Sequence, residues 1–234
     1  MLQTILVAAL ASAGVEDSGF RPANVGFLML EGVYNTELMA PFDVIQHVTF
    51  HDEKPPRVFT VALSEEPVET FEGLRITPDY TLENAPPIDV LVVPSARNNM
   101  GSDLEDARLI RWVAERGKKA RHVISLCDGA FVLAQAGLLD GVRATTFPGD
   151  QDAFEKKFPK VNLVRNVSFV DAGHALTSVG GAKSYDVAMY FVEKVYGAKA
   201  VKAIGTGLVI DWDLSKVRHE VAPPSSGEGQ SGLR

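Results

Sequence analysis

A lone cysteine lies at a point of the sequence where its thiol could act as a nucleophile. Cys127 is the only cysteine among 234 residues, so it cannot form a disulfide within its chain or belong to a four-cysteine zinc site. It follows the apolar segment 122–126 and precedes Asp128 and Gly129, where a helical pattern begins. This is the pattern of a nucleophile elbow, with only the second glycine kept. A helix N-terminus favours thiolate, so we expect a lowered pKa at Cys127; the alternative is a small buried hydrophobic residue.

Short apolar segments alternate with amphipathic helical segments along most of the chain. Helices are predicted at 36–48, 103–117, 130–139, 150–158, 180–196 and 199–209, with Pro41 in the first turn of its helix. Strands are predicted at 24–30, 57–63, 88–93, 122–126, 144–147, 167–171 and 175–178, and residues 68–80 form a turn-rich β-like stretch. The alternation predicts an α/β fold with a mostly parallel sheet and helices on both faces. Cys127 then lies in the crevice at the carboxyl ends of the strands.

The two ends of the chain differ in composition from its middle. Residues 1–23 are predicted to be an N-terminal extension, and residues 5–13 within it are apolar and small. Since no lysine or arginine precedes that run, we expect a cytoplasmic protein, with an atypical export signal as the alternative. Residues 24–221 are predicted to form one domain, and residues 222–234, rich in Pro, Gly and Ser, a disordered tail. No stretch reaches the ~20 apolar residues of a membrane span.

Composition excludes several classes of function. Acidic residues outnumber basic ones 30 to 23, which gives a net charge of −7 and argues against a nucleic-acid partner. Neither a Walker loop nor a Rossmann fingerprint is present, and no metal-ligand spacing is evident, so we expect neither a cofactor nor a metal. We expect a small-molecule substrate as the partner.

Four stretches of the sequence together resemble one protein family. They are residues 25–45, 89–96, 123–148 and 175–197, and their order and spacing resemble the ThiJ/PfpI superfamily of class I glutamine amidotransferase-like proteins. The superfamily includes isonitrile hydratases and the front domains of AraC-type regulators. The resemblance implies a flavodoxin-like three-layer sandwich and, commonly, a homodimer.

The resemblance also implies roles for particular residues. Glu37, which precedes Leu38-Met39-Ala40-Pro41, occupies the position of the acidic residue that approaches the elbow cysteine. Such a carboxyl group is favourable beside sulfur only if burial raises its pKa and keeps it protonated. Asp128 could serve as a second acid or base, but its carboxylate could also oppose ionisation of the thiol. Glu37 could equally be a helix N-terminal acid.

The remaining candidate residues would form an oxyanion site and a pocket. The resemblance places backbone donors at Asp128 and near Ser95 and Ala96, and the pocket candidates are Gly129, Thr146 and Ser178. Ser178 could instead help to cap the helix after it. Arg97 could bind an anion, although a solvated arginine is the favoured interpretation. Phe147 stands where related sequences carry histidine, and His174 opens a strand, so a cysteine–histidine pair is not expected.

Three hypotheses of function follow. The first is a cysteine-dependent enzyme resembling isonitrile hydratase, with a Cys127 thiolate as nucleophile, Glu37 as acid/base and Asp128 as auxiliary group. The second is a redox or stress-response protein in which Cys127 is oxidised without turnover. The third is a ligand-binding domain related to transcriptional regulators.

Overall fold

A computed structural model describes residues 19–221, so the predicted tail and residues 1–18 of the predicted extension lie outside the described residues. The helices are α1 (Asn35–Gln46), α2 (Ala107–Lys119), α3 (Gly129–Gln135), α4 (Gln151–Lys157) and α5 (Ser184–Leu208). The strands are β1 (Asn24–Leu28), β2 (Arg57–Ala62), β3 (Val68–Glu69), β4 (Arg75–Ile76), β5 (Tyr80–Thr81), β6 (Val90–Val93), β7 (His122–Leu126), β8 (Arg143–Ala144), β9 (Asn162–Leu163), β10 (Phe169–Asp171), β11 (Ala175–Ser178) and β12 (His219–Val221).

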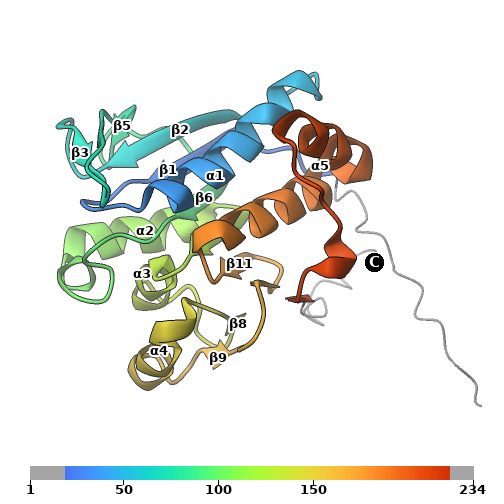
Figure 1. The fold of residues 1–234 in the computed structure, drawn as a ribbon. Helices are drawn as coiled ribbons and strands as arrows, with labels where there is room; N and C mark the ends of the chain where they lie inside the picture. The colour runs from blue at the N-terminus through green and yellow to red at the C-terminus, as the bar shows by residue number, and fades with distance from the viewer. Residues whose placement is uncertain (1–18, 222–234) are drawn as a thin grey trace, which may run out of the picture.

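One large sheet organises the molecule (Figure 1). Its eight strands lie in the order β12-β10-β11-β7-β6-β1-β2-β5. Every pairing is parallel except that of β10 with β11, so β10 and β12 run against the other six. The prediction of a mostly parallel α/β sheet is confirmed. The antiparallel hairpin was not foreseen; the short turn around Gly173, whose N–H binds the Asp171 side chain, joins the two strands without a crossover helix.

The helices cover the sheet in two layers, which makes a three-layer sandwich of the flavodoxin-like kind. Helix α1 packs against α5, and α2 packs against α3 (Figure 1). The β1–α1–β2 and β6–α2–β7 crossovers leave adjacent strands in opposite directions, and right-handed crossovers then lie on opposite faces of the sheet. Strands β6 and β7 are buried along their whole length, as expected for strands covered on both sides.

Several element boundaries differ from the predictions for local reasons. Helix α2 begins at Ala107 rather than 103, because the Asp106 side chain accepts the N–H groups of Arg108 and Leu109 and caps the helix there. Pro41 lies in the middle of α1, not in its first turn. The predicted strand 144–147 shrinks to β8, and its other residues form a loop beside Cys127.

The long C-terminal helical region breaks where two helices were predicted. Gly197 has a φ of 82° inside α5, so the helix consists of two segments.

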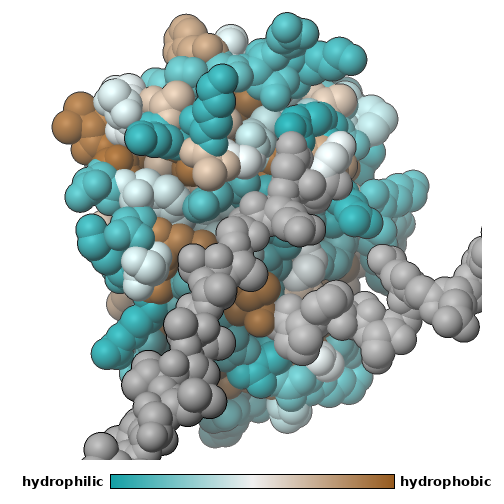
Figure 2. All heavy atoms as spheres, turned by 90° about the vertical axis from the view of Figure 1, so that its right-hand side faces the viewer, coloured by the Kyte–Doolittle hydropathy of each residue, from teal (hydrophilic) through white to brown (hydrophobic). Residues whose placement is uncertain are grey.

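On the side of the molecule that faces right in Figure 1, visible apolar residues form separate patches among hydrophilic ones (Figure 2). Among residues 19–221, no helix has the length and apolar character to cross a membrane.

Candidate functional site

The topology brings the ends of three strands together. Strands β1 and β6 are neighbours whose crossovers leave in opposite directions, and ligands of open α/β sheets bind at such a switch point. Glu37 belongs to the helix after β1, Ser95 follows β6, and Cys127 follows β7. The structure therefore places these three predicted site residues together at the carboxyl ends of the central parallel strands.

The backbone at Cys127 is held in a left-handed conformation. Its φ of 51° is uncommon for a residue with a side chain, and such strain costs about 1–3 kcal/mol. The Cys127 N–H donates to Ser178 O at 2.9 Å, which extends the pairing of β7 with β11. A Cβ atom at Gly129 would lie 2.0 Å from Val93 O, and one at Gly180 would lie 2.4 Å from Cys127 Cβ. Glycine at both positions thus lets the cysteine turn fit against its neighbours.

Glu37 lies beside the thiol with both carboxyl oxygens engaged. Its Oε2 accepts the Ser95 N–H at 3.1 Å, and its Oε1 accepts the Gly181 N–H at 3.0 Å. The Cys127 thiol also hydrogen-bonds to this carboxyl group. Only 4% of Glu37 is exposed, and burial raises its pKa against the opposing effect of these hydrogen bonds. The predicted raised pKa of Glu37 is confirmed in direction.

Cys127 has a raised pKa, opposite to the lowered value expected from a helix N-terminus. Burial of the thiol is the largest cause, and the charges of Glu37 and Asp128 act in the same direction. The Asp128 N–H and the Ser95 hydroxyl hydrogen-bond to the sulfur and lower its pKa, but by less. Since α3 has only seven residues, its field is outweighed. The site therefore holds a neutral thiol rather than a free thiolate.

Asp128 lies near a hydroxyl group and a second acidic residue, Asp150, which both affect its pKa. Thr146 Oγ1 lies 3.0 Å from Cys127 O and 3.1 Å from Asp128 Oδ1, so its hydroxyl donates at the base of the cysteine turn. Burial raises the pKa of Asp128 to about 7, and the charge and hydrogen bond of Asp150 contribute in the same direction. Sequence reasoning missed Asp150. Its place at the start of α4, after the Thr146 loop, was the available signal.

The predicted oxyanion donors near Ser95 are occupied by side chains of the protein. The Ser95 N–H binds Glu37, and the Ala96 N–H binds Asn99 Oδ1 at 2.8 Å. Ser178 contributes its carbonyl to Cys127, while its hydroxyl donates to Ser168 O at 3.2 Å. The Ser178 hydroxyl also accepts the Gly180 N–H at 3.3 Å, so this side chain holds the turn before α5.

Two of the histidines, His122 and His174, lie at the amino ends of the parallel strands, opposite the thiol site. His174 Nδ1 is 3.2 Å from Arg121 O, and His122 Nδ1 is 2.9 Å from Gly173 O, both near the start of β7. Burial lowers the pKa of His122 to about 4. Phe147 is 45% exposed, in the loop that leads to Asp150. Among the described residues, no group of three or more His, Cys, Asp or Glu side chains is arranged to hold a metal ion.

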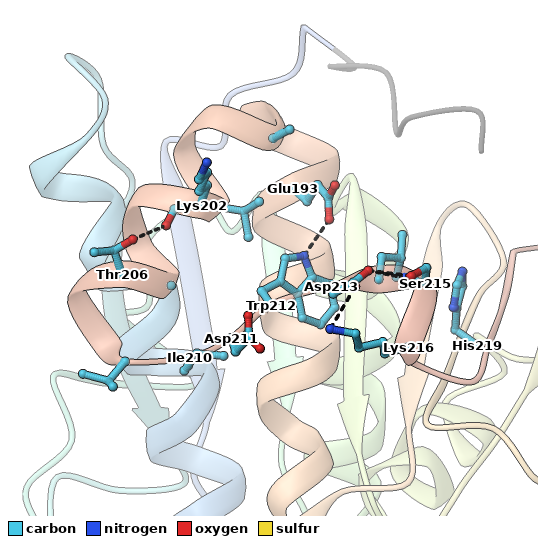
Figure 3. A pocket seen from close by; sticks show the side chains of 15 residues that line it. Glu193, Lys202, Thr206, Ile210, Asp211, Trp212, Asp213, Ser215, Lys216 and His219 are labelled. Carbon is cyan, nitrogen blue, oxygen red and sulfur yellow. Dashed lines mark hydrogen bonds and ion pairs between the residues drawn. The ribbon is translucent and has the colours of Figure 1, made fainter. Parts of the chain in front are cut away.

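A groove of about 1000 Å³ lies between the second segment of α5 and residues 209–219 (Figure 3). Trp212 lies at its centre and donates from Nε1 to Glu193 Oε2 at 2.7 Å. Lys216 forms an ion pair with Asp213 at 3.2 Å. None of the residues around Cys127 lines this groove, so it is separate from the thiol site.

The strained cysteine turn, the buried acid beside it and the switch-point topology together define an α/β protein with a buried thiol at the carboxyl ends of its parallel strands. A family model described as the DJ-1/PfpI family matches residues 23–195. The chain belongs to this family.

Relatives of known function are distant. Isonitrile hydratase of Pseudomonas putida is 28% identical over 181 residues, which cover 77% of this chain and 75% of that protein. The HTH-type transcriptional regulator GbdR of Pseudomonas aeruginosa is 24% identical over 211 residues, 90% of this chain. The chain spans only 57% of that regulator's length.

Solved structures share the fold. A ThiJ/PfpI family protein from Pseudomonas syringae has a TM-score of 0.73 at 22% identity, covering 97% of this chain and 88% of its own. An AraC family transcriptional regulator from Pseudomonas putida has a TM-score of 0.69 at 20% identity, covering 80% of this chain and 100% of its own.

Proposed function

We propose that this protein is a cysteine-dependent enzyme that adds water to a small electrophilic carbon, as an isonitrile hydratase does. The observation that carries the proposal is the juxtaposition of two buried side chains, the Cys127 thiol and the Glu37 carboxyl group, each with a raised pKa. Similarity to isonitrile hydratase supports the substrate class. The proposal includes a small-molecule substrate and a homodimer, and assigns neither a metal nor a cofactor.

The neutral pair fits an attack in which a proton moves together with sulfur. Cys127 Sγ forms a bond to the isocyanide carbon while the thiol proton passes through Glu37 to the same carbon. The product of this step is a thioimidate, R–N=CH–S. Because no free thiolate is needed, the raised pKa of Cys127 does not prevent the reaction.

Water completes the sequence. Water adds to the thioimidate carbon, and one of its protons reaches nitrogen through Asp128, whose pKa of about 7 suits proton exchange near neutral pH. The remaining hydroxyl proton returns to sulfur as the C–S bond breaks. The products are an N-formyl amine and the original thiol, so all atoms and protons are accounted for.

The test is turnover of isonitriles by the purified protein, with formamide measured by mass spectrometry. Cys127→Ser should lower the rate by at least about 10³-fold, because removal of a nucleophile abolishes the covalent route. Ser125→Ala is the matched control, since its buried hydroxyl has no hydrogen-bond partner among the described residues. An unchanged rate in Cys127→Ser, or no formamide from the wild-type protein, contradicts the proposal.

A second candidate is ligand binding without turnover. Its support is the similarity to the regulator GbdR and to a solved AraC family regulator. In this case Cys127→Ser would bind the same small molecules as the wild type while neither produces formamide. Oxidation sensing is less consistent with the structure, because the thiolate is the form that peroxide oxidises and this site favours the thiol.

A further inference from the structure

Three side chains from separate segments stack at the surface beside the thiol site. The Tyr34 and Phe71 rings have centroids 4.5 Å apart and an interplanar angle of 23°. The Arg97 guanidinium lies 5.9 Å from the Phe71 centroid. Tyr34 precedes α1, Phe71 lies between β3 and β4, and Arg97 follows β6. We call Tyr34, Phe71 and Arg97 the recognition wall.

The hairpin that carries Phe71 is fixed in place by backbone hydrogen bonds. The Phe71 N–H donates to Val33 O at 2.9 Å, and the Gly32 N–H donates to Glu69 O at 2.8 Å. The turn is closed by Thr70, whose hydroxyl accepts the Leu74 N–H at 3.0 Å. Phe71 is nevertheless 50% exposed. The fold thus fixes the backbone that presents an aromatic side chain at the surface, where a ligand could contact it.

The recognition wall is linked to the thiol site through Ser95. The Tyr34 N–H donates to Ser95 O at 3.1 Å, and the Ser95 hydroxyl hydrogen-bonds to the Cys127 sulfur. The pKa of Tyr34 is raised by burial and then by the charges of Cys127, Glu37, Asp128 and Glu72. Arg97 lies two residues beyond Ser95, and its N–H donates to Gly32 O at 3.1 Å.

Charge determines which ligand would fit. Arg97 forms no ion pair with any carboxylate among the described residues, so its guanidinium is available to an anion. The charges of Glu37 and Asp128 act on the thiol, and Asp150 acts on Asp128, so this acidic site disfavours an anion. An anionic group must therefore be at the end of the ligand that is remote from the reacting carbon.

We propose that the recognition wall selects substrates in which a flat apolar group separates the reacting carbon from a carboxylate, with the flat group against Phe71 and the carboxylate on Arg97. This inference rests on the proposed function for the reacting carbon, but the binding preference can be tested without turnover. Aryl isonitriles that bear a carboxylate, such as 4-isocyanobenzoate, represent the class.

The experiment compares 4-isocyanobenzoate with its methyl ester and with cyclohexyl isocyanide. The wild type should prefer the carboxylate to the ester by about tenfold or more in kcat/KM, the usual range for a charge-assisted hydrogen bond. Arg97→Gln should remove this preference by raising KM for the carboxylate, while kcat/KM for the ester stays the same. Phe71→Leu should raise KM about two- to tenfold for both aryl substrates but not for the cyclohexyl compound.

Matched controls lie on the same hairpin. Arg75→Gln removes an exposed arginine that pairs with Glu69 at 3.3 Å, and Leu74→Ala removes an exposed apolar side chain outside the recognition wall. Both should retain the wild-type preference. Equal kcat/KM for carboxylate and ester in the wild type, or a loss shared by Arg75→Gln, overturns the proposal.

A binding measurement separates this inference from the proposed function. The product of 4-isocyanobenzoate hydration, 4-formamidobenzoate, is titrated into Cys127→Ala by calorimetry, with N-phenylformamide as the uncharged comparison. Preferential binding of the carboxylate that Arg97→Gln abolishes supports the recognition wall even if no isonitrile is turned over. Turnover without any carboxylate preference in binding or kinetics supports the proposed function and refutes the recognition wall.

Discussion

Two buried carboxyl groups, Asp171 and Glu37, lie near opposite ends of the parallel strands and differ in their hydrogen-bond and ion-pair partners. Asp171 is 1% exposed and accepts Tyr190 OH at 2.6 Å, Lys194 Nζ at 2.5 Å and the Gly173 N–H at 2.7 Å. Glu37 is 4% exposed and accepts two backbone N–H groups, and no ion pair of Glu37 occurs among the described residues.

The comparison shows that a counter-charge, rather than the degree of burial, distinguishes the two carboxyl groups. Lys194 balances the charge of Asp171, so this cluster ties β10 to α5. No cation balances Glu37, and the unfavourable desolvation of its charged form raises its pKa. A raised pKa brings the carboxyl group of Glu37 closer to exchanging protons near neutral pH.

The largest expected effect on stability comes from breaking the compensated pair. Lys194→Met should lower the free energy of unfolding by about 3–5 kcal/mol, because Asp171 is left as a buried charge without its cation. Urea unfolding followed by circular dichroism measures the change. Lys160→Met is the control, since its ion pair with Asp140 is largely exposed and should contribute less than about 1 kcal/mol. Equal losses in both variants would refute the assigned role of Lys194.

Substitution of Glu37 should lower activity strongly and stability only slightly. Glu37→Gln keeps one acceptor for the backbone donors, so the free energy of unfolding should change by only about 1–2 kcal/mol. Formamide production should fall at least about 10²-fold, because the amide cannot carry the proton. The exposed Glu31→Gln is the control and should match the wild type in both measurements. A Glu37→Gln variant that unfolds much more readily yet keeps its activity would show that Glu37 is structural.

The smallest expected effect concerns the pH dependence of Asp128. Asp150→Asn removes a group that helps to raise the pKa of Asp128 to about 7, so the pH–rate profile should shift down by about one unit. Because the pKa of Asp128 in the folded protein exceeds the 3.8 of an unperturbed aspartate, the contribution of Asp128 to stability is complete below pH 4. It is lost as pH rises through about 7.

Unfolding measurements check this sign. The unfolding free energy of the wild type should fall between pH 4 and 7 relative to that of Asp128→Asn. The variant has no titratable carboxyl group at position 128. Asp152→Asn, which changes a highly exposed carboxylate on α4, is the control for the rate profile. An unshifted profile in Asp150→Asn would exclude coupling between Asp150 and Asp128.

Local patterns predicted much of the sheet and the position of the cysteine. The apolar runs around β6 and β7 identified buried strands, and the Cys127 turn fell between a strand and a helix as expected. Boundaries were less predictable where one side chain decides them, as Asp106 does at the start of α2. The antiparallel hairpin of β10 and β11 was not foreseen, because strand direction depends on pairing across the sheet.

The sequence alone determined the family resemblance and the position of the single cysteine at a strand-to-helix turn, because residue type and spacing carry that information. The resemblance in turn implied the acidic partner at Glu37. Only the tertiary structure decided how these groups ionise. Helix position suggested a thiolate, but the combined burial and the carboxyl groups from separate segments favour the thiol. The same contacts revealed Asp150 and brought Phe71 and Arg97 together. Electrostatic environment depends on distances between residues far apart in the chain, and local sequence does not encode those distances directly.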